Sequence, residues 1–297
     1  MKLKSFVFVL LVSFLTVECK LQPQPQPLPS QRPVYIIAHR VNGHDEPGKM
    51  LEAGANALEI DLRYETKNGR WCVNHDTVKF CDEDSISKWF DALKKLPESI
   101  LKKISLIYFD IKDNGGHSSA IKQLQNYINN EFQQDSSLTR VKKVFSVAKY
   151  EDRGFLEPLY SSLSVDEFVL IGQESDSVKS IDYFIRHGVS NFCAGNGVFV
   201  YLPTTQKIRD SIAKAVEMRD RNNERCKPQC VFSWTYARES TIEEFLEVGV
   251  DGLLVGGDHL FITDKGAVEN MVNVINSKTK WRKAKRSDPF CEVGYGP

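Results

Sequence analysis

Short apolar segments that alternate with amphipathic ones place the strongest constraint on the fold of this chain. Nine segments have the length and apolar content of strands, at 34–38, 57–64, 71–75, 104–111, 143–148, 167–172, 190–193, 230–236 and 251–255. Most are separated by segments with apolar residues at helical spacing, at 85–96, 118–132, 177–187, 205–221 and 241–248. Such alternation is typical of a parallel sheet covered by helices.

One pair of strands is connected in another way. Between Tyr64 and Trp71 the chain contains Asn68-Gly69, the strongest short signal for a β-hairpin. The segment 71–75 is therefore predicted to return antiparallel to the strand before it, which leaves eight strands for one parallel set. Eight such strands within about 260 residues predict an α/β fold, a single (β/α)8 TIM barrel with a hairpin after the second strand.

The first residues have the features of an export signal. Lys2 and Lys4 precede an apolar stretch at 5–17, and Val17-Glu18-Cys19 has a small-x-small cleavage pattern. A transmembrane helix is not expected, because a span needs roughly 20 apolar residues. We therefore expect a signal peptide at 1–19 and a secreted, extracellular protein.

The segment that follows the expected cleavage site is dominated by Gln and Pro. Residues 20–33 cannot bury much apolar area, so this stretch is predicted to be an extended spacer. No comparable linker recurs, and residues 34–297 are expected to form one barrel domain.

The overall charge limits the classes of partner. The chain has 39 Lys and Arg against 39 Asp and Glu, which gives a formal net charge of zero. Nucleic-acid binding usually shows as a basic excess or a basic stripe, so no nucleic-acid partner is expected. A neutral lipid head group remains compatible with this balance.

Cleavage of the leader would leave an even number of cysteines. These are Cys72, Cys81, Cys193, Cys226, Cys230 and Cys291. Disulfides are the default in an oxidising compartment, and the sequence leaves their pairing open. The spacing of Cys226 and Cys230 also occurs in metal sites, but no second close pair accompanies it, which favours disulfides.

Polar residues gather on the predicted strands or at their ends. In a TIM barrel the active site lies at the carboxyl ends of the strands. The candidates are His39, Glu59, Asp61, His75, Asp110, Lys112 and Trp234. Glu59 and Asp61 are two residues apart, which places both carboxylates on one face of a strand, and Asp110 and Lys112 repeat this spacing. Three carboxylates suit Mg²⁺ better than zinc, and two histidines beside such a metal suit acid–base work on a phosphodiester.

Each candidate also has a purely structural interpretation. A single strand-end His or Asp is more often a cap or a turn residue, and Glu59 with Asp61 fits a solvated strand face. Lys112 fits an exposed loop charge, and Trp234 taken alone fits the core. The convergence of all of them on one predicted barrel face favours the functional interpretation.

Several motifs carry a family resemblance. They are Ala-His-Arg-Val-Asn at 38–42, Gly-Ala-Asn-Ala-Leu-Glu-Ile-Asp at 54–61, His75, Phe-Asp-Ile-Lys at 109–112, Trp-Thr at 234–235 and Gly-Val-Asp-Gly at 249–252. From about residue 34 to residue 290 the chain resembles the sphingomyelinase D/phospholipase D family, which is related to the glycerophosphodiester phosphodiesterases. The latter usually have His-Arg-Gly and then Glu-Asn-Thr, which this chain lacks, so the sphingomyelinase D-like branch is favoured.

The resemblance implies a role for each candidate. His39 and His75 would be the catalytic pair, and Glu59, Asp61 and Asp110 would hold Mg²⁺. Lys112 and Trp234 would contact the phosphate and the head group, and an aromatic face can hold a quaternary ammonium. Family members release choline from sphingomyelin or lysophospholipids, and the lipid's own hydroxyl can attack phosphorus to leave a cyclic phosphate.

The chain departs from the family pattern in three places. Cys72 precedes His75 and Cys81 follows it, whereas the cysteines of the spider members follow the second histidine closely. The Gly256-Gly257 region stands where the family has Asn after the last strand. The tail 287–290, Ser-Asp-Pro-Phe, partly resembles an Asp-Asn-Pro-Trp-like ending that is implied to plug the lower end of the barrel.

The leading hypothesis is a secreted, Mg²⁺-dependent phospholipase D. Its substrate would be sphingomyelin or a choline lysophospholipid at a membrane or lipoprotein surface, and the protein would act as a monomer. One alternative is a phosphodiesterase for soluble glycerophosphodiesters. The other is a non-catalytic lipid-binding barrel, against which the two histidines argue.

Overall fold

The structure, a computed structural model, describes the greater part of the chain. It covers residues 31–75, 81, 84–113, 118–172, 176–198, 203–221, 227–256 and 264–290. The expected signal peptide and nearly all of the expected spacer lie outside these residues. Gly257, Cys226 and Cys291 lie outside them as well. Within the described ranges, no helix is long and apolar enough to cross a membrane.

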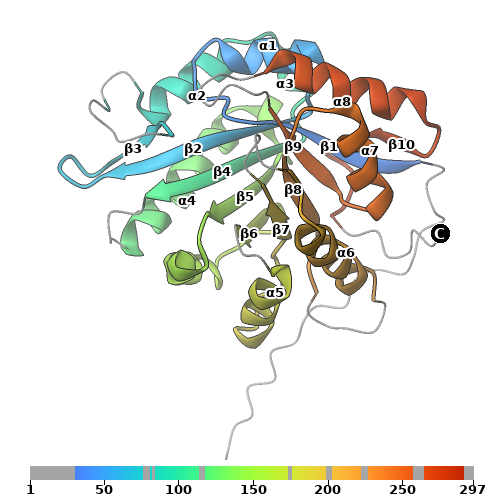
Figure 1. Cartoon of the computed structure of the whole chain (residues 1–297). Helices are drawn as coiled ribbons and strands as arrows, with labels where there is room; N and C mark the ends of the chain where they lie inside the picture. Colours follow the sequence, from blue (N-terminus) through green and yellow to red (C-terminus); the bar gives the residue numbers. More distant parts are fainter. Residues whose placement is uncertain are drawn as a thin grey trace, which may run out of the picture.

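Eight strands form the expected parallel barrel, with helices around its outside (Figure 1). They are β1 (Arg32–Ala38), β2 (Ala57–Glu65), β4 (Leu106–Asp113), β5 (Lys142–Val147), β6 (Glu167–Ile171), β7 (Ala194–Gly197), β8 (Val231–Tyr236) and β9 (Gly252–Val255). Their order in the sheet is β6-β5-β4-β2-β1-β9-β8-β7. A parallel bridge between Val169 and Phe192 joins β6 to the residues just before β7, so the sheet nearly closes on itself.

The seventh strand was placed wrongly by the sequence pattern. Segment 190–193 was expected to be the strand, whereas β7 consists of the following residues, Ala-Gly-Asn-Gly. Glycine has a low intrinsic preference for strands, so this segment lacks the usual signal. The side chain of Trp234 explains the composition, because a Cβ at Gly195 would lie 2.6 Å from its ring.

Two short strands extend the sheet beyond the barrel. β3 (Arg70–Val73) pairs antiparallel with β2, which confirms the hairpin. Gly69 in the connecting turn has φ +63°, a conformation that glycine adopts without a steric penalty. At the other end of the barrel, β10 (Trp281–Lys283) pairs parallel with β1.

Helices and short helical turns connect the strands. They are α1 (Glu46–Ala53), α2 (Ile86–Lys94), α3 (Glu98–Leu101), α4 (Ser118–Gln134), η1 (Ser136–Leu138), η2 (Tyr150–Leu159), α5 (Ser177–Arg186), α6 (Gln206–Asp220), α7 (Glu239–Val248) and α8 (Lys265–Ser277). Several begin at a side-chain cap: Asp176 accepts from the backbone N–H of Val178, and Thr205 from that of Ile208. Between β5 and β6 the 3₁₀ segment η2 replaces an α-helix, and Pro158 within it cannot donate a helical hydrogen bond.

The apolar core has two layers. The larger layer packs between the helices and the outer face of the strands, and the smaller one fills the barrel. Phe290 belongs to the inner layer and is only 6% exposed, with its ring centroid 4.5 Å from that of Phe168 and 5.3 Å from that of Tyr35. The tail therefore closes the barrel interior with a Phe.

Two disulfides join residues of the barrel and the hairpin. Cys72 pairs with Cys81, with Cα atoms 5.4 Å apart, and Cys193 pairs with Cys230, at 4.7 Å. The first encloses the segment that contains His75, so the loop of the second predicted histidine is tied back to β3. The second links the start of β7 to the start of β8.

Candidate active site

The polar candidates come from neighbouring strands at the carboxyl end of the barrel. His39 directly follows β1, Glu59 and Asp61 lie in the middle of β2, and Asp110 and Lys112 lie in β4. In the register of β2 and β4, Asp61 is the partner of Asp110. Because side chains alternate along a strand, residues two apart face the same side. The sequence prediction that these groups share one face is confirmed.

Three carboxylates form a compact and largely buried cluster. Oxygens of Glu59, Asp61 and Asp110 lie within 4.8 Å of one another. Each residue also has one buried oxygen that accepts no hydrogen bond: Oε1 of Glu59 and Oδ1 of the two aspartates. Oδ1 of Asp61 lies near a counter-ion, Nζ of Lys112, whereas Oε1 of Glu59 and Oδ1 of Asp110 have no hydrogen-bond partner among the described residues. Buried polar atoms normally have partners, so this group of oxygens fits a divalent cation with oxygen ligands.

A single ammonium group balances part of this negative charge. Nζ of Lys112 lies 3.0 Å from Oδ1 of Asp61 and also contacts Oδ2 of Asp110. Burial disfavours the charged amine, but Asp110 and Asp61 outweigh burial and raise the pKa of Lys112. Three ionised carboxylates with one ammonium would leave two negative charges, which a divalent cation would neutralise.

The carboxyl groups differ in their pKa values. Burial, with the charge of Asp61 added to it, raises the pKa of Glu59 well above its ordinary value, and burial also raises that of Asp110. Burial alone would raise the pKa of Asp61 as well, but Lys112 and His39 hold it at about 2. The cluster therefore favours binding a cation over holding three separate ionised acids.

His39 lies against this cluster. Its Nε2 is 3.9 Å from Oε2 of Glu59. Burial lowers the pKa of His39 to about 3, although the charge of Asp61 opposes the shift. The imidazole is therefore neutral near pH 7, and a neutral imidazole has a lone pair that can accept a proton.

His75 follows the hairpin strand β3 and is held from two sides. A guanidinium N–H of Arg40 contacts Nε2 of His75. This contact holds the imidazole of His75 beside the guanidinium of Arg40. The guanidinium of Arg63 donates to the backbone carbonyl of His75 at 2.8 and 3.0 Å. The Cys72–Cys81 disulfide encloses the same segment.

Three residues that orient the site received no role from sequence reasoning. Arg40 contacts His75 through its side chain and donates from its backbone N–H to Glu59. Asn42 donates from Nδ2 to Asp61 at 2.7 Å and accepts from the backbone N–H of Asp61 at 3.0 Å. Arg63 is the third. Arg40 and Asn42 belong to the motif at 38–42, and this motif is the feature of the sequence that could have pointed to them. Their contacts could not be predicted from it, because their partners are distant in the sequence.

Trp234 lies on β8, partly buried. Its ring packs against glycines at the ends of two other strands. A Cβ added to Gly172 would lie 3.4 Å from the indole, and one added to Gly197 would lie 2.5 Å from it. The peptide bond between Trp234 and Thr235 is cis. These glycines are the reason the indole can lie at the barrel end instead of among the outer helices.

A second group of potential metal ligands does not fit a metal. Glu65, Cys72 and Cys81 lie within the same mutual distance of 4.8 Å. The two sulfurs form a disulfide, however, and a disulfide lacks the thiolate that binds zinc.

The chain is similar in sequence to known proteins. The family model of the dermonecrotic toxin SPH matches residues 29–289. A dermonecrotic toxin of Sicarius terrosus, StSicTox-betaIB1i, is 27% identical and covers 76% of this chain and 88% of its own length. Dermonecrotic toxin Hl-PLD1 of Hemiscorpius lepturus is 25% identical over 97% of this chain and 95% of the relative.

A relative from another organism and a solved structure are also similar to this chain. A sphingomyelinase D of Aspergillus flavus is 27% identical, covering 76% of this chain and 78% of the relative. Among solved structures, a putative glycerophosphoryl diester phosphodiesterase of Silicibacter pomeroyi shares the fold, with a TM-score of 0.52 and 13% identity over 84% of this chain and 96% of that one. The chain therefore belongs to the dermonecrotic toxin SPH family, a sphingomyelinase D family of phospholipase D-type phosphodiesterases.

Proposed function

We propose that the protein is a secreted, Mg²⁺-dependent phospholipase D that releases choline from sphingomyelin or a choline lysophospholipid. The observation that carries the proposal is the cluster of three carboxylates, each with one buried oxygen that accepts no hydrogen bond, beside His39 at the carboxyl end of the barrel. The donors are all hard oxygens, and water and a phosphate oxygen can complete the shell that Mg²⁺ prefers.

The residues of the chain have separate proposed roles. Bound Mg²⁺ would polarise the phosphoryl oxygens and lower the cost of charge at phosphorus. Lys112, already ion-paired with Asp61, adds a positive charge on the same side. Neutral His39 takes the proton of the attacking hydroxyl as the new P–O bond forms. His75, in its imidazolium form, gives a proton to the choline oxygen as the old P–O bond breaks, and the proton that His39 took passes to solvent.

The attacking hydroxyl belongs either to water or to the lipid. Attack by the lipid's own hydroxyl leaves a cyclic phosphate, and attack by water leaves a phosphomonoester. In both cases the leaving group is the same alcohol, so His39 and His75 serve both routes.

Trp234 is proposed to contact the head group. Its partly buried indole lies at the carboxyl end of β8, on the same barrel rim as the carboxylates. The face of an indole attracts a quaternary ammonium by about 0.5–2 kcal/mol, more when the site is dry. The net charge of zero supplies no general attraction to anionic lipid, so engagement with a membrane or lipoprotein surface would depend on this end of the barrel.

Secretion is proposed from the chemistry of the cysteines. The two disulfides, Cys72–Cys81 and Cys193–Cys230, persist in an oxidising compartment and are rare in the cytosol. The expected leader at 1–19 agrees with export. Mass spectrometry of the protein secreted by expressing cells should place the mature amino terminus after Cys19.

The experiment is an assay of choline release with product identification. Purified protein is incubated with sphingomyelin and lysophosphatidylcholine, with Mg²⁺ or with EDTA, and phosphorus NMR identifies the products. We expect Mg²⁺-dependent choline release and, for intramolecular attack, a cyclic phosphate. Absence of choline from both lipids would refute the proposal.

Two controls separate the alternative functions. Glycerophosphocholine without a lipid surface tests the soluble phosphodiesterase, which would prefer it over both lipids. His39→Asn keeps a hydrogen-bonding side chain but removes the base, and it should abolish choline release without loss of the folded state. If His39→Asn kept the full biological activity, the non-catalytic lipid-binding barrel would be favoured instead.

A further inference from the structure

A basic pocket lies at the end of the barrel opposite the carboxylate cluster. It has a volume of about 630 Å³ and lies where β2, β4 and β5 begin, beside the segment after β10. Its cationic residues are Lys102, Lys103, Arg140, Lys283, Lys285 and Arg286. Glu52 is the sole acidic residue among the described residues that line it. In a chain of zero net charge, this is a local concentration of positive charge.

Two of the six cationic side chains already bind other groups of the protein. Lys102 pairs with Glu98, at 2.7 Å between Nζ and Oε1. Arg286 donates to the backbone carbonyls of Leu101, Ile104 and Ser137. Within the described part of the chain, the other four, Lys103, Arg140, Lys283 and Lys285, form no ion pair with a carboxylate.

Arg286 also explains why the pocket has a fixed shape. Its guanidinium ties the segment after β10 to the turn after α3 and to η1. The carbonyl of Ala284 accepts from Asn56 at 2.8 Å and from Ser105 at 3.1 Å. Cationic side chains from separate segments are therefore held on one preformed surface, which lowers the entropic cost of binding a ligand.

The ammonium groups of the pocket repel one another. Burial lowers the pKa of Lys283, and the charge of Lys103 lowers it further. The carbonyls at the end of α1 offset part of this, since Nζ of Lys103 lies 3.5 Å from the carbonyl of Leu51 and Nζ of Lys283 lies close to Gly54. A helix C-terminus carries only about half a negative charge, which is less than two ammonium charges.

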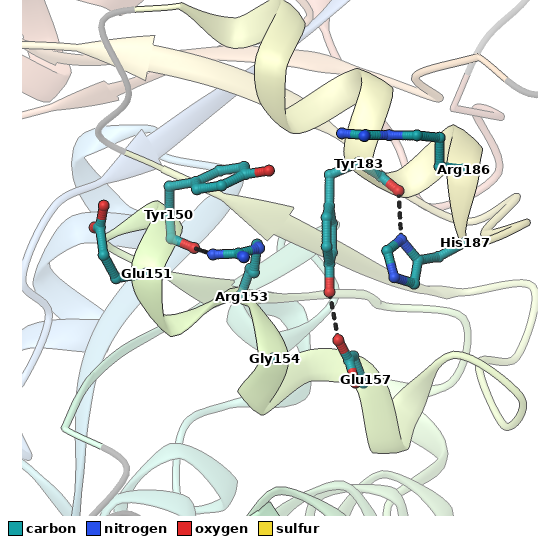
Figure 2. Close-up of a pocket in the computed structure, with 8 residues that line it drawn as sticks. All are labelled: Tyr150, Glu151, Arg153, Gly154, Glu157, Tyr183, Arg186 and His187. Carbon is teal, nitrogen blue, oxygen red and sulfur yellow. Dashed lines mark hydrogen bonds between the residues drawn. The ribbon is translucent and has the colours of Figure 1, made fainter.

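A second pocket has a lining in which the formal charges balance. It lies outside the barrel between η2 and α5, and Figure 2 shows hydrogen bonds among the residues that line it. Tyr183 donates its hydroxyl to Glu157 at 2.5 Å, and Arg153 donates to the carbonyl of Tyr150 at 2.9 Å (Figure 2). Two glutamates face two arginines there, so the formal charges of this lining cancel, unlike those of the basic pocket.

The basic pocket is too distant from the carboxylates to serve the same bound molecule. Asn56 lines the pocket just before β2, and Asp61 of the carboxylate cluster lies five residues further along that strand. Five residues of an extended strand span about 17 Å. A lipid held at the carboxyl end leaves the basic pocket facing water. Its ligand should therefore come from solution.

We propose that the basic pocket binds a compact soluble polyanion that carries two or more phosphate or sulfate groups. One such group would lie between Lys103 and Lys283 and relieve their repulsion, and a second would reach Lys285 or Arg140. Charge-assisted hydrogen bonds to phosphate or sulfate are about twice as strong as neutral ones, so several cations around one ligand favour a multiply charged species.

Titration calorimetry with inorganic tripolyphosphate tests the proposal. The protein is kept in EDTA, so that a metal at the carboxylate cluster cannot bind the probe. The pocket variant Lys103→Gln/Lys283→Gln/Lys285→Gln should bind tripolyphosphate at least about tenfold more weakly than the unmodified protein. The control Lys67→Gln/Lys207→Gln/Lys214→Gln removes the same charge from exposed positions elsewhere and should bind like the unmodified protein.

The outcomes separate a specific site from general attraction of anions to lysine side chains. Sucrose octasulfate in place of tripolyphosphate shows whether sulfate or phosphate is preferred, and pocket-dependent binding of either supports the site. Equal affinity of the pocket and control variants would overturn it, as would pocket-dependent binding to phosphatidylserine vesicles without binding to either soluble probe. Both variants should keep choline release and the melting temperature of the unmodified protein, which shows that a lost affinity is not lost folding.

Discussion

The carboxylate cluster makes a prediction about stability that needs no lipid assay. Oxygens of Glu59, Asp61 and Asp110 lie within 4.8 Å of one another. At an effective dielectric constant of about 20, two negative charges at that separation repel by about 3 kcal/mol. Lys112 offsets part of this repulsion, yet the pKa of Glu59 stays raised. Without metal, Glu59 should therefore keep its proton to a higher pH than an ordinary glutamate does, and it should release that proton when a cation binds.

The perturbation is Glu59→Gln, which keeps the shape of the protonated acid and cannot ionise. Without metal, its free energy of unfolding should lie within about 1 kcal/mol of that of the wild type near pH 5, because the two side chains are then nearly equivalent. With Mg²⁺ at 100 times its dissociation constant, the wild type should gain about 2.7 kcal/mol. For a domain of this size, that gain raises the melting temperature by about 5–10 °C.

The assay is thermal unfolding followed by circular dichroism, in EDTA and in rising Mg²⁺. The variant should lose most of the Mg²⁺-dependent rise, whereas Glu217→Gln, a change at an exposed glutamate of α6, should keep it. An equal rise in the wild type and in Glu59→Gln would refute the assignment of Glu59 to the metal. A variant destabilised by more than about 3 kcal/mol in EDTA would refute the argument that Glu59 is protonated there.

Three further predictions concern pH, the barrel plug and the indole. In EDTA the wild type should become less stable relative to Glu59→Gln as pH rises above 4.5. The reason is that a carboxyl whose pKa is raised in the folded state favours folding only while it is protonated. Melting curves from about pH 5 to about pH 8 measure the difference in stability, and a difference that stays constant with pH would contradict the prediction. Phe290→Ala should lower the free energy of unfolding by about 3–5 kcal/mol in urea titrations, and Phe290→Leu by less, since the ring is buried among three others. Gly197→Ala should reduce choline release, because the new Cβ would lie 2.0 Å from the carbonyl oxygen of Trp234 and displace that residue. Gly154→Ala is the control, because its Cβ would meet nothing closer than 3.8 Å. Equal loss of choline release in both variants would contradict the role of the Trp234 indole.

The barrel could be predicted from local patterns. Apolar runs with period two and helical segments with period 3.6 reflect backbone geometry, which acts within a few residues. The hairpin at Asn68-Gly69 was predicted for the same reason, since a turn type is set by its own residues. Local signals failed at β7, where packing against Trp234, from another strand, selects glycine over residues that favour strands.

The candidate site was partly predictable. The i, i+2 pairs Glu59 with Asp61 and Asp110 with Lys112 placed four groups on one face, because side chains alternate along a strand. The roles of His39 and His75 remain predictions. The contacts of Arg40 with His75 and of Asn42 with Asp61 could not be derived, because they join segments whose separation depends on the register between strands.

The sequence by itself determined the class of fold, the alternation of elements and the residue types available at the carboxyl ends of the strands. Tertiary structure alone decided which cysteines pair and which cations share the basic pocket. A net charge of zero conceals that pocket, since Lys103, Arg140 and Lys283 come from distant parts of the chain. Local preferences are encoded within a few neighbouring residues, whereas contacts between distant segments exist only once the barrel has closed in one register.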